Sequence, residues 1–401
     1  MIFREITKKE YDDFWKKSEQ QSFLSSSSIC GIDETVEIFY VGVEEKGKII
    51  AASILRGYRR HFGWKSFYVL RGPLMDYGNE KLVKFFAKEL KEFLRKKNGY
   101  VVKIDPYVEL LERDIDGKIV DGGYNNAVFD GNLKEAGFLK TKYVHNVSQI
   151  EWMFVTELTG EDEQSLLKKM KVATRGAIKH AEEWGITVRD LKRDELDKFY
   201  EVERQTAERR NFGMREIDYY KKMYDLYGDN VSFVVAELNP KECLARIQRK
   251  YDDAMVRKNN GEKNKKLGDE IYSLEVRLEK VKGIFKNPKD ETIVLAAGMF
   301  MTTKTEIVYF VGGNIEKYMK LGGQYLIQWE MIKRAMKNKC ARYNFYGIAP
   351  NIDTHPENYG VYGFKKGFSG KVVQLIGEYE LPIDKKKYYT MKIFEKLRRL
   401  I

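Results

Sequence analysis

Two periods of hydrophobic residues alternate in the first third of the chain. Aromatic residues recur every three or four positions in residues 6–20, which predicts a helix. Beyond this helix the period shortens to two, and the short apolar runs end at Gly or Pro, as strands do. The predicted elements are strands at residues 37–44, 48–58, 66–71 and 100–104 and a helix at residues 81–97. This order indicates a mixed α/β layer domain.

The same succession of elements begins again near residue 150. A strand at residues 149–157 is predicted to precede a helix at residues 165–181 that is rich in Lys and Arg. After it, the pattern predicts strands at residues 186–190 and 231–237 and helices at residues 194–210 and 217–227. The repetition indicates one fold used twice. We therefore expect a first domain at residues 1–147 and a second at residues 148–401.

Residues 239–288 interrupt the second domain with a different helical pattern. Apolar residues step by three and four in two runs, separated by an Asn-Asn-Gly turn. The runs are Leu244, Ile247, Tyr251 and Met255, and then Leu267, Ile271, Leu274, Leu278 and Val281. This spacing predicts an antiparallel coiled-coil hairpin. Such a lysine-rich arm is either a handle for RNA or another protein, or a solvated structural insertion.

The remaining elements follow the same two periods. Polar, Gly-rich residues 111–131 predict a loop. The elements predicted elsewhere are helices at residues 133–138, 325–338 and 387–400 and strands at residues 292–302, 306–311, 342–345 and 371–378. The last helix is basic and amphipathic, so it either packs on the core or contacts a membrane surface.

Composition narrows the choice of partners and compartment. The 401 residues carry a net charge of +12, which favours nucleic acid, nucleotide phosphates or an anionic membrane leaflet as partners. The three cysteines are scattered and form no CxxC pair, as expected in a reducing compartment. No signal-peptide pattern and no apolar run of about 18 residues occurs. We expect a cytoplasmic protein that is at most peripheral to a membrane.

The segment at residues 355–383 contains the residue best suited to catalysis. Pro and Gly divide it into a turn, an aromatic segment at residues 359–364, two lysines, a bend and a strand. Lys365 lies among Tyr362, Phe364 and Phe368 in the sequence. A lysine in a partly dry aromatic setting can stabilise a developing oxyanion. The alternative is a lysine at a strand end whose side chain passes the aromatic rings into water.

Other catalytic motifs are missing from the sequence. The four histidines have no spacing suited to a metal site or a catalytic triad, so no metal is expected. Residues 319–324 lie where an N-acetyltransferase holds coenzyme A phosphates, but they lack the basic-residue and glycine spacing of that family. Asp105 ends a strand before a proline, where it is either a ligand contact or a turn cap.

Several longer motifs resemble the Fem (FemABX) family, whose members are aminoacyl-tRNA-dependent peptidyltransferases that build the interpeptide bridges of bacterial peptidoglycan. The motifs are HPENYGVYGFKKGFSGKVVQLIGEYELPI (355–383), VYFVGGNIEKYMKLGGQYLIQWEMIKRA (308–335), RYNFYGI (342–348), GPLMD (72–76), KIDP (103–106), ATRGAIKHAEEWGI (173–186) and AERRNFGMREIDYY (207–220). The resemblance implies an α/β (α+β) fold. It consists of two tandem N-acetyltransferase (GNAT)-like domains with the coiled-coil arm inserted in the second.

The resemblance also assigns roles to individual residues. The lysine of the family's aromatic-Lys motif falls on Lys365, as the group that stabilises the tetrahedral oxyanion. The residues expected to bind substrate are Asp105, Arg215, Tyr219, Tyr309 and Tyr362. A further family tyrosine falls on Val311, two residues after Tyr309. The lysine expected near residue 30 is absent. These two departures point to an altered acceptor, and the missing lysine favours a lipid-linked one.

The expected reaction moves Gly, Ala or Ser from aminoacyl-tRNA to a peptidoglycan precursor, either UDP-MurNAc-pentapeptide or lipid II. No cofactor is expected, because aminoacyl-tRNA is itself the co-substrate. The basic helix offers tRNA contacts or a solvated face through Lys168, Lys169, Lys171, Arg175 and Lys179. Fem paralogues and the inner membrane leaflet are further expected partners. The rival hypotheses are an acyl-CoA-dependent N-acyltransferase and a non-catalytic tRNA or precursor binder.

Overall fold

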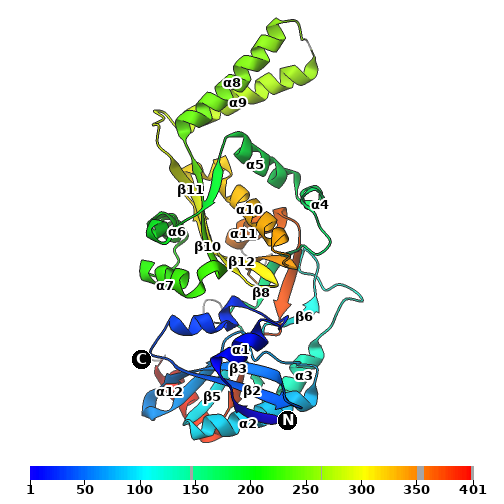
Figure 1. Ribbon diagram of the computed structural model, residues 1–401, viewed down its shortest axis with the longest axis vertical. Coiled ribbons are helices and arrows are strands. Elements are labelled where there is room, and N and C mark those ends of the chain that lie inside the picture. The colour runs from blue at the N-terminus through cyan, green and yellow to red at the C-terminus, as the bar shows by residue number, and fades with distance from the viewer. Residues whose placement is uncertain (145–147, 263, 350–355, 399–401) are drawn as a thin grey trace.

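The chain folds into two sheets stacked along the long axis of the molecule, with a helical arm at one end (Figure 1). The computed structural model describes residues 1–144, 148–262, 264–349 and 356–398. In these residues, no helix combines the length and the apolar character needed to cross a bilayer.

The first sheet has seven strands, and helices cover it. Its strands are β1 (Ile2–Glu5), β2 (Glu37–Glu45), β3 (Lys48–Arg59), β4 (Lys65–Val69), β5 (Gly99–Ile104), β15 (Tyr379–Pro382) and β7 (Leu139–Lys140), in that order. β1 to β4 pair antiparallel, whereas β4 and β5 pair parallel. A parallel pair needs a crossover, and α2 (Glu80–Lys96) supplies it with an apolar face that includes Phe86, Leu90 and Leu94.

The second sheet repeats this plan with eight strands. Their order is β6 (Glu109–Glu112), β14 (Lys371–Leu375), β8 (Trp152–Glu157), β13 (Arg342–Gly347), β12 (Glu306–Asn314), β11 (Ile293–Thr302), β10 (Val231–Leu238) and β9 (Thr187–Asp190). β9 to β12 pair antiparallel, and α10 (Gly323–Lys337) carries the crossover to the parallel strand β13. The shared plan confirms the mixed α/β class and the prediction of one fold used twice.

Two strands do not follow the division of the chain at residues 147 and 148. β6 comes from the first half and pairs with β14 in the second sheet. β15 comes from the C-terminal end and pairs with β5 and β7 in the first sheet. The two halves therefore exchange strands, and the predicted boundary stays a prediction for independently folding units.

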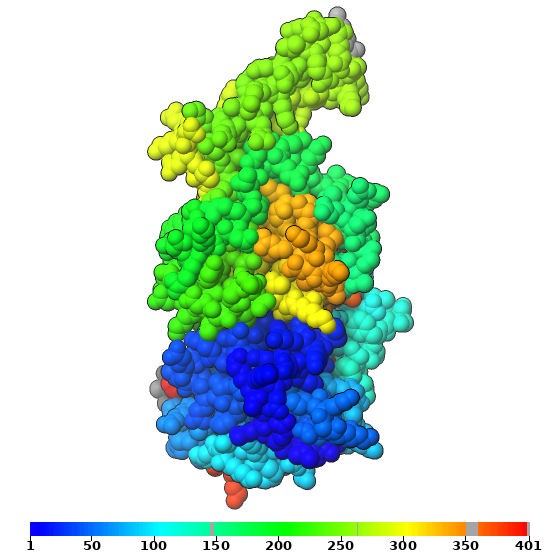
Figure 2. All heavy atoms as spheres, viewed as in Figure 1, coloured from blue at the N-terminus to red at the C-terminus, as the bar shows by residue number. Residues whose placement is uncertain are grey.

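The arm consists of two antiparallel helices, α8 (Pro240–Asn259) and α9 (Lys265–Ile284), inserted between β10 and β11. The buried residues of α9 repeat every three or four positions and face α8: Leu267, Ile271, Leu274, Leu278 and Val281. Figure 2 shows the arm standing clear of the molecular body. Two helices thus form a hairpin within residues 239–288, whereas the coiled-coil packing of this arm stays a prediction.

Three local predictions need correction. Residues 165–181 form two helices, α4 (Glu163–Lys169) and α5 (Val172–Glu183), because Met170 and Lys171 between them are extended. The predicted loop at residues 111–131 contains the start of α3 (Ala127–Glu135). The aromatic segment expected to end in a strand-end lysine belongs instead to a helix, α11 (Pro356–Gly367).

The other helices lie close to their predicted positions. They are α1 (Lys8–Trp15), α6 (Leu196–Arg210), α7 (Ile217–Tyr227) and α12 (Lys385–Arg398). A Thr7 capping box starts α1, and α6 ends at Asn211, which has a left-handed conformation. α6 and α7 pack beside β12 and β10, so the segment that joins them lies at the edge of the site described next.

Candidate active site

Lys365 lies in the last turn of α11 and is buried, with 5% of its side chain exposed. Its Nζ donates to the backbone carbonyls of Gly347 at 2.6 Å and Tyr346 at 3.4 Å, both in β13. Burial, together with the nearby Arg210 guanidinium, lowers the pKa of Lys365 to about 7. The lysine is therefore a cation that is easily neutralised near physiological pH.

A cavity of about 690 Å³ opens beside this lysine. Its walls come from the segment between α6 and α7, from β12 and β13, and from the facing sides of α10 and α11. Four of the predicted site residues line it together: Lys365, Arg215, Tyr219 and Tyr309. Residues that lie 150 positions apart in the sequence thus meet around one space of substrate size.

Arg215 and Tyr219 line the cavity beside the start of α7. Arg215 is exposed just before α7, and its guanidinium lies over the Tyr219 ring at 5.5 Å from the centroid. Partial burial raises the pKa of Tyr219, so its hydroxyl stays protonated at neutral pH. An exposed arginine held against an aromatic face is well placed to bind a phosphate or a carboxylate.

Tyr309 lies deeper in the cavity, on β12. Its hydroxyl accepts a hydrogen bond from Nε2 of Gln324 at 2.8 Å, and its ring stacks on Phe300. The pairing of β12 with β11 shifts at this point, so Tyr309, Phe310 and Val311 all reach the cavity. Val311 therefore contacts the same space where the resemblance predicts a tyrosine.

Asp105 lies next to this cavity rather than in it. It is buried at the end of β5, accepts a hydrogen bond from the Arg71 backbone N–H at 2.8 Å, and pairs with the Arg71 guanidinium at 3.5 Å. Burial raises the pKa of Asp105 to about 7, although Arg71 opposes the shift. Arg71 also donates to the carbonyl of Ile150, a residue that lines both the main cavity and a small one at Asp105.

A sequence model described as the FemAB family matches residues 6–396. The chain belongs to the FemAB family. The aminoacyltransferase FemA of Staphylococcus epidermidis is 29% identical over 420 residues that cover all of both chains. FemB of the same species is 30% identical over 414 residues, 99% of each chain. A crystal structure of FemX has the same fold, with a TM-score of 0.79 over 97% of this chain and 99% of that one, at 22% identity.

In this FemAB-family aminoacyltransferase, the other predicted site residues lie outside the cavity. The Tyr362 hydroxyl donates to the carbonyl of Ile115, and its ring packs on Phe154. Arg175 donates to the carbonyls of Leu167, Lys168 and Met170, so it closes the end of α4. The remaining predicted tRNA contacts are exposed on α4, on α5 and on the link between them: Lys168, Lys169, Lys171 and Lys179.

The FemAB cavity also contains polar residues that the sequence interpretation missed. Glu203 is 4% exposed, and its Oε1 accepts from the Tyr220 hydroxyl at 2.5 Å. Its Oε2 and the Oε1 of Gln324 have no hydrogen-bond partner within the described residues. Burial raises the pKa of the Glu203 carboxyl. The available signal was an acidic residue on the apolar face of α6, beside Val202 and Thr206.

Proposed function

We propose that this FemAB-family aminoacyltransferase moves Gly, Ala or Ser from aminoacyl-tRNA to the stem-peptide amine of a peptidoglycan precursor, UDP-MurNAc-pentapeptide or lipid II. The observation that carries the proposal is the meeting of Lys365, Arg215, Tyr219 and Tyr309 around one cavity. These residues supply a buried cation, an exposed anion-binding group and two tyrosine hydroxyls. The names of the FemA and FemB relatives support the reaction class.

The chemistry needs no covalent enzyme intermediate and no cofactor. The precursor amine attacks the ester carbonyl, a C–N bond forms, and the C–O bond to the tRNA ribose breaks. The leaving ribose oxygen takes up the proton that the amine releases. Holding both substrates in reacting geometry supplies ~7–11 kcal/mol. One donor to the oxyanion, the role of Lys365, adds about 2.7–4 kcal/mol.

The cavity contains groups for both ends of such substrates. Arg209, Arg210 and Arg215 line one part of it and suit phosphate or carboxylate groups. The free acceptor atoms of Glu203 and Gln324 suit an amine, because its N–H groups donate hydrogen bonds. The exposed lysines on α4 and α5 are proposed to meet tRNA phosphates farther from the ester.

A transfer assay tests this proposal. Purified protein is mixed with charged tRNA and a muropeptide precursor, and labelled amino acid is followed into the peptide. We expect transfer that RNase abolishes and that Lys365→Ala reduces at least about 100-fold, the loss typical of an oxyanion donor. The matched control is Lys366→Ala on the next position, whose ammonium pairs with Asp116.

Two outcomes would contradict the proposal in different ways. Transfer that requires only acyl-CoA would make the chain an N-acyltransferase. Binding of tRNA or precursor without turnover would make it a non-catalytic binder. Contacts with the inner leaflet and with Fem paralogues are part of the same proposal, and co-sedimentation with lipid II vesicles or with a purified paralogue tests each.

A further inference from the structure

The carbonyls that hold Lys365 belong to a strained part of β13. Tyr346 has a φ of 63°, a left-handed conformation that is costly for a bulky residue. The pairing of β13 with β8 shifts between Asn344 and Gly347, so a β-bulge lies here. The two acceptors of the Lys365 ammonium are therefore the carbonyls of the bulge itself, at Tyr346 and Gly347.

Asn344 holds the bulge in this conformation. Its Oδ1 accepts the Tyr346 backbone N–H at 2.8 Å, a side-chain contact that compensates for the missing strand pairing. Asn344 is fully buried, so no water replaces this bond. Loss of the contact would remove the hydrogen bond that Asn344 accepts from the Tyr346 N–H and leave the left-handed turn without this partner.

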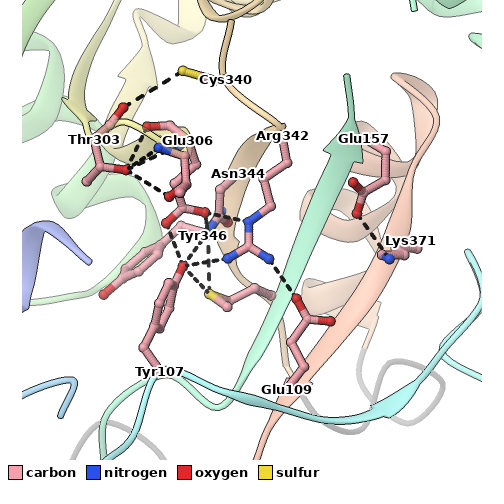
Figure 3. Close-up of polar contacts among 12 residues, drawn as sticks. Tyr107, Glu109, Glu157, Thr303, Glu306, Cys340, Arg342, Asn344, Tyr346 and Lys371 are labelled. Carbon is pink, nitrogen blue, oxygen red and sulfur yellow. Dashed lines mark hydrogen bonds and ion pairs between the residues drawn. The ribbon is translucent and has the colours of Figure 1, made fainter. Parts of the chain in front are cut away.

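A buried network sets which way the Asn344 amide faces (Figure 3). Its Nδ2 donates to Oε2 of Glu306 and to the Tyr107 hydroxyl, each at 3.1 Å. The amide therefore turns its NH₂ toward the Glu306 side chain and its oxygen toward the backbone N–H of Tyr346.

Glu306 is itself fixed by groups from both halves of the chain. It is fully buried and accepts from Arg342 Nε at 2.8 Å and from the Tyr107 hydroxyl at 2.6 Å. Arg342 also pairs with Glu109 at 2.7 Å. Tyr107 and Glu109 follow β5, whereas Glu306 and Arg342 begin β12 and β13. A connected set of partners of this kind restricts the position of every member.

We propose that Asn344 is a positioning residue for Lys365, because it fixes the bulge whose carbonyls place the ammonium at the cavity wall. The inference rests on the proposed function, in which Lys365 stabilises the oxyanion. Asn344 touches no reacting atom in this scheme. It acts through the backbone of Tyr346 and Gly347.

The groups around Lys365 make its titration a direct measure of this arrangement. Arg210 of α6 disfavours the ammonium, whereas the two bulge carbonyls stabilise it. Tyr309, Tyr325 and Tyr346 stay neutral at pH 7 because burial raises the pKa of each. If the carbonyls move away, the pKa of Lys365 falls below its already lowered value.

The experiment measures the pKa of Lys365 by NMR on protein carrying ¹³Cε-labelled lysine, with the signal assigned from Lys365→Arg. We expect Asn344→Ala to lower this pKa by about one unit or more and to reduce kcat at pH 7 about fivefold or more. The fall of kcat at high pH should shift to lower pH by the same amount, which general destabilisation does not produce.

A neighbouring residue provides the matched control. Tyr343→Phe removes a buried hydrogen bond on the same strand, from the Tyr343 hydroxyl to Oε1 of Gln328 at 2.6 Å. Tyr343 precedes Asn344, so its side chain faces the opposite side of the sheet. We expect a comparable loss of stability with no change in the pKa of Lys365.

A second substitution tests the role of the left-handed turn. Gly adopts positive φ without strain, so Tyr346→Gly added to Asn344→Ala should move the pKa of Lys365 back toward the wild-type value. If the Asn344→Ala variant does not fold, Asn344→Ser, a smaller polar replacement, is measured in its place. It should also lower the pKa of Lys365.

The outcomes separate this inference from the proposed function. An unchanged or raised Lys365 pKa in the Asn344 variants, with kcat retained, would overturn the positioning role while Lys365→Ala still abolished transfer. If Lys365→Ala left transfer intact, the proposed function would fail, and the NMR titration would still test whether Asn344 controls the Lys365 ammonium.

Discussion

Lys365 is a cation in surroundings that favour its neutral form. Lys365 can stabilise an oxyanion only while its side chain is protonated. Its pKa of about 7 means that it loses the proton within the physiological pH range. The same is true of Asp105, whose pKa burial raises to about 7. Lys365 lines the main cavity and Asp105 the small one, and Ile150 lines both, so two ionisable groups poised near neutrality lie in neighbouring cavities.

The Lys365 titration predicts a fall in kcat as pH rises. The pKa of this lysine is lowered, so the ammonium is present below about pH 7 and is lost above it. With saturating substrates, kcat should drop about tenfold per unit above that pKa. The measurement is a pH–rate profile. A Lys365→Arg profile without the fall would attribute it to this residue, since a guanidinium does not titrate there, whereas an unchanged fall would assign it elsewhere.

The sequence around Lys365 singled out this residue as a catalytic candidate, but it predicted neither the helix that contains it nor the carbonyls that accept its hydrogen bonds. Aromatic residues beside glycines at positions 360, 363 and 367 resemble a strand with bends, because glycine weakens the helical signal. The acceptors at Tyr346 and Gly347, the Arg71 partner of Asp105 and the buried Glu203 all come from distant segments. The hydrophobic pattern within one element carries no information about contacts with another element. The site residues themselves were therefore predictable, and most of their partners were not.

At the scale of elements, α4 and α5 show how one basic pattern divides into two roles. Arg175 is turned inward and donates to three carbonyls at the end of α4. Lys168 and Lys171 are exposed on either side of the break between the helices. A single helix at residues 165–181 would have placed all of them on comparable faces.

This division predicts opposite effects for two sets of substitutions. Arg175→Ala should destabilise the fold by about 1–2 kcal/mol, the cost of lost helix-end hydrogen bonds. The Lys168→Glu/Lys171→Glu pair should leave thermal stability unchanged and weaken tRNA binding about tenfold or more. Thermal unfolding and a filter-binding assay measure the two quantities. Equal loss of tRNA binding in both variants, at equal stability, would contradict the assignment.

We expect that the outer half of the arm can be removed without loss of the fold. Tyr251 and Glu275 lie opposite each other, joined by a hydrogen bond of 3.0 Å, so a short turn can replace residues 252–274. The base of the arm, where Lys280 covers Trp184 and Arg277 pairs with Glu183, would remain.

We expect this shortened protein to unfold at a temperature within a few degrees of the full chain, because the arm projects away from the molecular body (Figure 2). Circular dichroism measures the transition, and tRNA binding by the same variant distinguishes a handle for RNA from a structural insertion. A large loss of stability would show that the outer arm supports the core.

At the scale of the whole molecule, a net charge of +12 favours association with polyanions over any single contact. Binding of tRNA should therefore weaken as salt rises, because each neutralised phosphate releases counterions. Between about 50 and 200 mM salt we expect at least a tenfold loss of affinity. Titration at several salt concentrations gives the slope, and a slope near zero would exclude the proposed phosphate contacts on α4 and α5.

The repeated sheet plan was predictable from the order of elements, since each half carries its own run of antiparallel strands and its own crossover helix. The exchange of β6 and β15 between the sheets was not. Strand pairing between distant segments leaves no periodic mark in either segment, so only the three-dimensional arrangement reveals it.

The return of β15 to the first sheet has a consequence for how the protein is made. A ribosome releases β5 long before it delivers residues 379–382, so the nascent first sheet waits with an open edge. Until then, β5 can pair with strands from other nascent chains. A fragment of residues 1–147 produced alone keeps that edge permanently, and we expect it to self-associate where the complete chain stays monodisperse.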